Sequence, residues 1–136
     1  MKKTKNERGQ SLVELSISLV LLLLLLSGAV EFGMAFFQFV QLRDAVQEGA
    51  LYGSMDPTNS AAIIDRVQGS SDSPIDLTTL TPIITIIGPK ACEGNGIKVE
   101  LTYDHPIIMP FLPQILGGST IPLKASVTDT ILSPVC

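Results

Sequence analysis

The sequence is poor in the residues from which catalytic and metal sites are built. Its 136 residues include two cysteines, one histidine and no tryptophan. These offer no zinc ligand set at a standard spacing, and we find no nucleophile, base and orienting group that could act together. The sequence therefore predicts no enzyme, no metal site and no cofactor. We interpret His105, which precedes a proline, as a turn residue.

Positive charge is scarce outside the N-terminus. Four of the nine Lys and Arg residues lie within the first nine positions, and the whole chain has a formal net charge of −4. The rest of the chain is therefore more acidic than the whole, and nucleic-acid phosphates would repel it. We expect no nucleic-acid partner.

Proline is absent before Pro57, so no proline interrupts a helix in the first part of the chain. Residues 15–30 carry no charge and are about long enough to cross a bilayer as a helix. The basic residues before them place the N-terminus in the cytoplasm by the positive-inside rule. Glu14 lies at the cytoplasmic end, where a charge costs less than the ~3 kcal/mol typical of the bilayer centre. We expect one helix from about residue 11 to about residue 52.

Three interpretations of this segment are open. It is a secretory signal peptide cut after Ala29, an uncleaved single-pass anchor, or a segment retained after cleavage at Gly9. A cut at Ala29 would divide an apparently continuous helix.

The helical pattern becomes amphipathic after residue 30. Apolar residues recur at alternating steps of four and three: Ala35, Phe39, Leu42, Val46 and Gly49. Polar residues follow the same spacing on another face: Gln41, Asp44 and Glu48. This half of the helix is suited to carrying a globular head.

Residues 55–136 read as a small head. A short helix is capped by Asn59 or Ser60 and closed by Gly69. Strands are predicted within residues 81–88, 96–104 and 120–132, the last two with clear alternation. The predicted fold is α+β: a long N-terminal helix packed against a small antiparallel sheet of about three strands.

The connection between the last two strands, HPIIMPFLPQILGG, holds three prolines and many apolar residues. Such a composition is unusual for a loop. It is either a flap that packs on the sheet or an exposed patch that contacts a neighbouring subunit. In the second case Ile108 and Phe111 are the expected contact residues.

Three segments resemble a known family. GQSLVEL, residues 9–15, resembles the processing signal of type IV pilins, in which a prepilin peptidase cuts after the glycine and a glutamate is fifth in the mature chain. Residues 30–53 and 97–130 resemble TadE-like pseudopilins of tight-adherence (Tad) pilus systems. The most specific positions of the middle segment are Val30, Glu31, Phe32, Gly33, Gln47, Glu48, Gly49 and Ala50. Leu15 departs from the tyrosine usual in the major pilins of these systems, which favours the TadE-like branch.

The resemblance implies a minor pilin or pseudopilin with a cleaved cytoplasmic leader (1–9), a long helix (10–54) and a head (55–136). Such a subunit is held in the cytoplasmic membrane with its head outside, then assembled into an extracellular filament for adhesion. Its partners would be other pilin subunits, the prepilin peptidase, the inner-membrane assembly machinery and, before assembly, lipid. The alternative is a membrane-anchored accessory protein that does not polymerise.

The resemblance also implies a role for Glu14. Cleavage would leave a positively charged amine on Gln10, and an unpaired charge in a filament core is strongly disfavoured. We expect Glu14 to accept the Gln10 amine of a neighbouring subunit and set the axial register. The alternative is that Glu14 simply lies in the headgroup layer.

The two cysteines are Cys92 and Cys136. In an antiparallel meander the third strand runs back toward the turn that contains Cys92, so Cys136 should arrive nearby. A bond between them would close a loop of about 45 residues and stabilise the head by roughly 4 kcal/mol in the chain-entropy model. Two free thiols, or pairing between subunits, are the alternatives.

Overall fold

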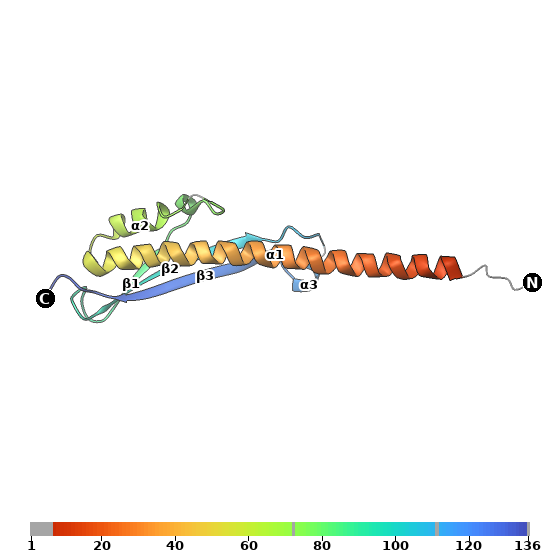
Figure 1. The fold of residues 1–136 in the computed structure, drawn as a ribbon. Helices are drawn as coiled ribbons and strands as arrows, with labels where there is room; N and C mark the ends of the chain where they lie inside the picture. The colour runs from red at the N-terminus through yellow and green to blue at the C-terminus, as the bar shows by residue number, and fades with distance from the viewer. Residues whose placement is uncertain (1–6, 72, 111, 136) are drawn as a thin grey trace, which may run out of the picture.

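A single helix forms the length of the molecule. The computed structural model describes residues 7–71, 73–110 and 112–135. Helix α1 runs from Glu7 to Met55, 49 residues without interruption, or about 73 Å at 1.5 Å per residue. Figure 1 shows α1 carrying the head on its C-terminal half and projecting beyond the rest of the chain at its N-terminal end. The predicted helix is confirmed, and it extends about a turn further at each end.

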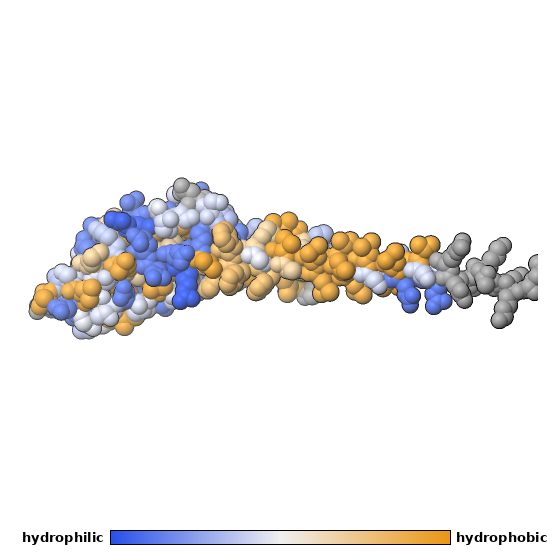
Figure 2. Space-filling view, viewed as in Figure 1, coloured by the Kyte–Doolittle hydropathy of each residue, from blue (hydrophilic) through white to orange (hydrophobic). Residues whose placement is uncertain are grey.

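The two halves of α1 differ in what surrounds them. The apolar side chains of the first half are exposed on all sides, from Leu12 at 65% to Leu26 at 56%. Figure 2 shows this stretch as a hydrophobic stalk. In the second half Leu42 and Val46 are fully buried and Gly49 is buried, while Phe39 is partly buried against the core. The predicted amphipathic stripe is therefore the face that packs under the head.

Helix α2, Ser60–Gln68, lies on α1. The side chain of Asn59 accepts a hydrogen bond from the Ala62 amide at 3.2 Å, and Gly69 is the C-cap. Of the two caps predicted, the structure uses Asn59. Ile63 and Val67 point inward and are fully buried. A short 3₁₀ helix η1, Leu77–Thr79, follows and buries Leu77.

The other side of α1 is covered by one antiparallel sheet in the order β1-β2-β3. The strands are β1, Ile83–Ile87, β2, Gly96–Pro106, and β3, Thr120–Thr130. The inward residues of β2 are those predicted from alternation, with Ile97, Val99 and Leu101 almost fully buried. β1 is an edge strand with Ile83 and Ile87 exposed. The α+β fold, a long helix against a three-stranded sheet, is as predicted.

The segment between β2 and β3, residues 107–119, is called the flap below. It contains the single-turn helix α3, Leu112–Leu116. Figure 1 shows α3 beyond the end of the sheet, beside α1. The flap therefore packs along α1 rather than over the sheet face, which differs from the sequence interpretation of a flap on the sheet. The cause is the length of the strands: β2 continues to Pro106, paired with Thr120 of β3, so the flap begins only at the end of the sheet.

Candidate functional site

The first turns of α1 carry the predicted processing and register residues. Gly9, Gln10 and Glu14 are all exposed, and a Cβ built on Gly9 would meet nothing within 4 Å. Within the described residues, nothing therefore packs against Gly9. Cleavage there, and the pairing of Gln10 with Glu14 between subunits, stay predictions.

A buried polar cluster joins α1 to the end of β2. Glu31 is 3% exposed. Its Oε1 lies 3.0 Å from His105 Nε2 and accepts a hydrogen bond from the Ile108 amide at 3.1 Å. The other ring nitrogen of His105, Nδ1, lies 2.5 Å from Oε1 of Gln38, which is two turns after Glu31 on α1. Because a carboxylate only accepts hydrogen bonds, Nε2 is the ring nitrogen that carries a proton toward Glu31. One carboxylate thus fixes both the end of β2 and the start of the flap.

The interpretation of His105 as a turn residue was wrong. His105 lies within β2, pairs with Ile121 of β3 and is 1% exposed. The alternation Ile97, Val99, Leu101 and Tyr103 continues to it in phase, so the period of two already pointed it inward. The following proline misled the interpretation, because Pro106 ends the strand and needs no amide partner there.

Glu48, Gly49 and Ala50, which are among the positions that resemble the TadE-like family, lie where α2 packs on α1. A Cβ on Gly49 would collide with the Val67 side chain, and Ala50 is fully buried. Only small residues allow the two helices to approach this closely. Glu48 lies 3.7 Å from Arg66 with both side chains about half exposed, a pair that adds little stability. The glycine and alanine are therefore packing residues, and Glu48 is a surface residue.

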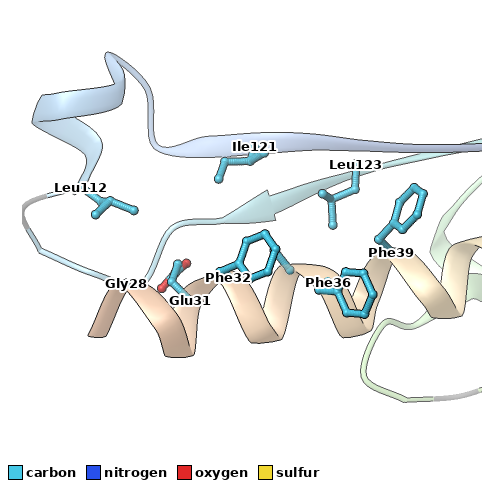
Figure 3. Close-up of a pocket in the computed structure, with 9 residues that line it drawn as sticks. Gly28, Glu31, Phe32, Phe36, Phe39, Leu112, Ile121 and Leu123 are labelled. Atoms are coloured by element: carbon cyan, nitrogen blue, oxygen red, sulfur yellow. The ribbon is translucent and has the colours of Figure 1, made fainter. Parts of the chain in front are cut away.

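An apolar groove opens between α1, the flap and β3. Its volume is about 370 Å³. Figure 3 shows Leu112 of the flap and Leu123 of β3 across the groove from Phe32 and Phe36 of α1. The rings of Phe32 and Phe36 are stacked at 6.2 Å and are 72% and 57% exposed. The aromatic residues that follow the apolar run are thus largely uncovered, which is unusual for a head in water alone.

The flap itself is also apolar and partly uncovered. Ile108 is 68% exposed and Leu116 57%. Phe111, the second residue predicted to contact a neighbouring subunit, lies outside the described residues. The contact predicted for Ile108 is sterically open and stays a prediction.

A comparison with family models finds a match to the N-terminal part of the chain. The model described as "TadE-like protein" matches residues 9–51. The chain carries a TadE-like segment. This confirms the resemblance found in the sequence for residues 9–15 and 30–51. The resemblance of residues 97–130 stays a prediction. No curated protein and no solved structure matches the chain.

The TadE-like segment coincides with most of α1. It includes Glu31 of the buried polar cluster and Gly49 and Ala50, which pack against α2. It begins at Gly9, contains Glu14 and Glu31, and ends just after Ala50. Within it, α1 is long and apolar enough to cross a membrane by length and composition, and its most apolar window has no buried residue. The helix is thus compatible with anchoring in a membrane.

The cysteine prediction rests on a strand order that is now observed. β3 runs back toward the turn before β2, and the chain after it stays beside that turn: the Glu93 amide donates to the Pro134 carbonyl at 2.9 Å and the Gly94 amide to that of Ile131 at 3.0 Å. Cys92 is 7% exposed. Cys136 lies outside the described residues, so its pairing with Cys92 stays a prediction, which non-reducing peptide mapping of protein from its native envelope checks.

Sequence reasoning also missed that Gln41 is a buried polar residue. Gln41, assigned to the polar face with Asp44 and Glu48, is 8% exposed. Its amide donates to the Ile75 carbonyl at 3.0 Å and accepts from the Ile75 amide at 2.9 Å. The amide and the carbonyl of Ile75 are thereby both hydrogen-bonded, and the linker before η1 is held against α1.

Proposed function

We propose that this chain is a structural, pilin-like subunit, a minor pilin or pseudopilin, of a Tad-type pilus. The observation that carries the proposal is the first half of α1, which is apolar and exposed on all sides. A helix that is hydrophobic all round needs lipid or other helices around it. A membrane supplies the first environment and a filament core the second.

The match to TadE-like proteins supports the same reading, because it begins at the predicted cleavage site and includes the whole apolar run. A prepilin peptidase cuts after Gly9 and leaves Gln10 as the first residue of the mature chain. The N-terminus starts in the cytoplasm and the head lies outside the membrane. The inner-membrane assembly machinery then transfers the subunit from lipid into an extracellular filament of pilin subunits.

In the filament, Glu14 accepts the amine of Gln10 from a neighbouring subunit. Both groups are exposed on the free chain, so they are accessible to a second copy. A buried pair of this kind contributes register more than net stability, because desolvation offsets most of the attraction.

We also propose that the chain is not an enzyme. His105, its one histidine, is committed to Glu31 and Gln38 and is 1% exposed, so its ring is closed to a substrate. Within residues 7–71, 73–110 and 112–135, no three His, Cys, Asp or Glu side chains are grouped so that they could hold a metal ion.

The mature N-terminus tests the processing step. Mass spectrometry of the chain expressed with its prepilin peptidase should find Gln10 first. A Gly9→Leu variant should remain uncut, whereas Gly33→Leu, at another exposed glycine of the same helix, should be cut normally. An intact Met1 in the unaltered chain would favour the anchored accessory protein, and a chain that begins at Val30 a secreted one.

Filament entry tests the register step. Glu14→Ala should insert and be processed but should not be incorporated into pili, since the amine of its neighbour would lack a partner. Asp44→Ala, an exposed carboxylate on the same helix, is the matched control. Normal incorporation of Glu14→Ala would refute the register role.

A further inference from the structure

The flap packs against turns of α1 that belong to the apolar run. A cavity of about 270 Å³ is lined on one side by Val20, Leu23, Leu24 and Ser27 and on the other by flap residues Met109, Pro110 and Leu112. The flap therefore reaches back from the head along the stalk. Whatever surrounds this part of α1 also surrounds the flap.

The length of α1 decides how deep the flap lies. From Glu14 to Val20 the helix rises only about 9 Å, against a hydrocarbon core about 30 Å thick. A spanning helix must therefore also place residues 20–30 in the core. That stretch rises about 15 Å, which is the depth of one leaflet. If α1 spans the membrane, the flap beside it lies at the level of the outer leaflet.

The composition of the flap suits lipid. Residues 106–119 contain no charged side chain. Backbone groups in lipid must be satisfied within the protein, and prolines reduce the need because they have no amide hydrogen. The flap has two, Pro110 and Pro113, and Pro106 directly precedes it.

The flap amides with observed partners follow the same rule. The Ile107 amide donates to the Ser119 carbonyl at 2.9 Å and the Gly117 amide to that of Pro113 at 2.9 Å. The Ile108 amide donates to the carboxylate of Glu31 at 3.1 Å. These three flap amides are thus satisfied within the protein, while the side chains of Ile108 and Leu116 are exposed.

The buried cluster fits the same boundary. Glu31 is the first charged residue after the apolar run, and a carboxylate facing lipid there would be costly. His105 and the Ile108 amide enclose it instead. The end of β2 and the flap thereby close over the charge at the point where α1 would leave the membrane.

We propose that the flap is a second membrane contact, immersed in the outer leaflet, with Ile108 and Leu116 against lipid acyl chains. The proposal rests on the proposed membrane-anchored function of α1. It commits to lipid as the partner of the flap on the unassembled subunit; a second copy of the chain is the competing partner, and the test separates them.

The absence of tryptophan from the chain provides the test. Single tryptophans are introduced as Ile108→Trp and Leu116→Trp in the full chain, reconstituted in phosphatidylcholine vesicles with or without brominated acyl chains, which quench tryptophan on contact. Both sites are more than half exposed, so the head keeps its packing, and two positions guard against a local disturbance in one of them. Leu19→Trp, in the spanning stretch, and Leu132→Trp, at the far end of the head, are the controls; both leucines are exposed, at 53% and 65%.

We expect brominated lipid to remove most of the emission of the Ile108, Leu116 and Leu19 variants and to leave that of the Leu132 variant unchanged. If the Leu19 variant is quenched but either flap variant is not, the immersed flap is overturned and the membrane anchor still holds. Blue-shifted but unquenched emission at the flap would likewise overturn it, in favour of a second copy. No quenching at Leu19 would overturn the membrane anchor itself, and the flap proposal with it.

Discussion

Removal of the Glu31 carboxylate should destabilise the head more than any exposed substitution on α1. Oε1 of Glu31 serves two groups, His105 Nε2 and the Ile108 amide. In Glu31→Ala the buried His105 ring and the partly buried Ile108 amide lose their acceptor, at about 1–3 kcal/mol each. The two losses together come to about 2–6 kcal/mol, and we expect a value of about 4 kcal/mol, near the middle of that range.

Glu31→Gln removes the negative charge but keeps a hydrogen-bond acceptor, so it separates the two contributions of Glu31. The amide oxygen can still accept, but each hydrogen bond to a neutral group is worth about 1 kcal/mol less than one to a charged group. With two such bonds, we expect a loss of roughly 2 kcal/mol. For a head of this size each kcal/mol lowers the melting temperature by about 4–8 °C, so the two variants should be clearly resolved.

The assay is thermal and urea unfolding of the full chain in detergent micelles, followed by near-ultraviolet circular dichroism of Tyr52 and Tyr103. Both tyrosines pack against the core, so their signal reports on the head. Asp44→Ala, exposed on the same helix, should change stability by no more than about 0.5 kcal/mol. A loss below about 1 kcal/mol in Glu31→Ala would refute the argument, and equal losses in both Glu31 variants would refute the separation of charge from acceptor.

Two further predictions concern the packed half of α1 and the sheet. Gly49→Ala should lower the free energy of unfolding by about 1–2 kcal/mol in the same assay, because overpacking against the stiff, fully buried Val67 outweighs the gain in helix propensity. In Gly33→Ala the new Cβ meets nothing within 4 Å, so the free energy of unfolding should rise by up to about 1 kcal/mol. A rise for Gly49→Ala would contradict the packing argument. Lys124, above all, lowers the pKa of the Glu100 carboxyl, so this ion pair stabilises the head at neutral pH. The contribution disappears as the pH falls from the unfolded pKa of about 4.5 through the lower folded pKa of Glu100. Glu100→Gln should therefore flatten the acid dependence of stability, and an unchanged pH profile would show that the ion pair contributes nothing.

The elements of the fold were predictable because each has a strong period. The strand alternation beginning at Ile97 and the stripe of α1 around Leu42 both mark faces that are buried in the structure. These signals are local, so they do not depend on knowing what packs against them. The extent of α1 was predictable for the same reason, since nothing before Pro57 breaks it.

The polar partners were not predictable because they are distant in sequence. Glu31 meets His105 across 74 positions, and Gln41 meets Ile75 across 34. A glutamine spaced like Asp44 and Glu48 is read as a surface residue, and only the linker folded over it makes it a core residue. The placement of the flap along the stalk has the same origin: composition identifies it as apolar, but the strand lengths decide where it goes.

The unbroken course of α1 also has a mechanical consequence. The helix runs through 49 residues with no proline, and the sheet and α2 are packed directly on its second half. If α1 spans a membrane as proposed, a pull on the head is transmitted along one continuous helix, and each residue drawn out of the membrane lifts the head by about 1.5 Å. Because the Ile108 amide of the flap is bonded to Glu31 of the same helix, the flap would then move in step with α1. The work of extracting such a subunit would include the removal of the flap from lipid as well as that of the helix.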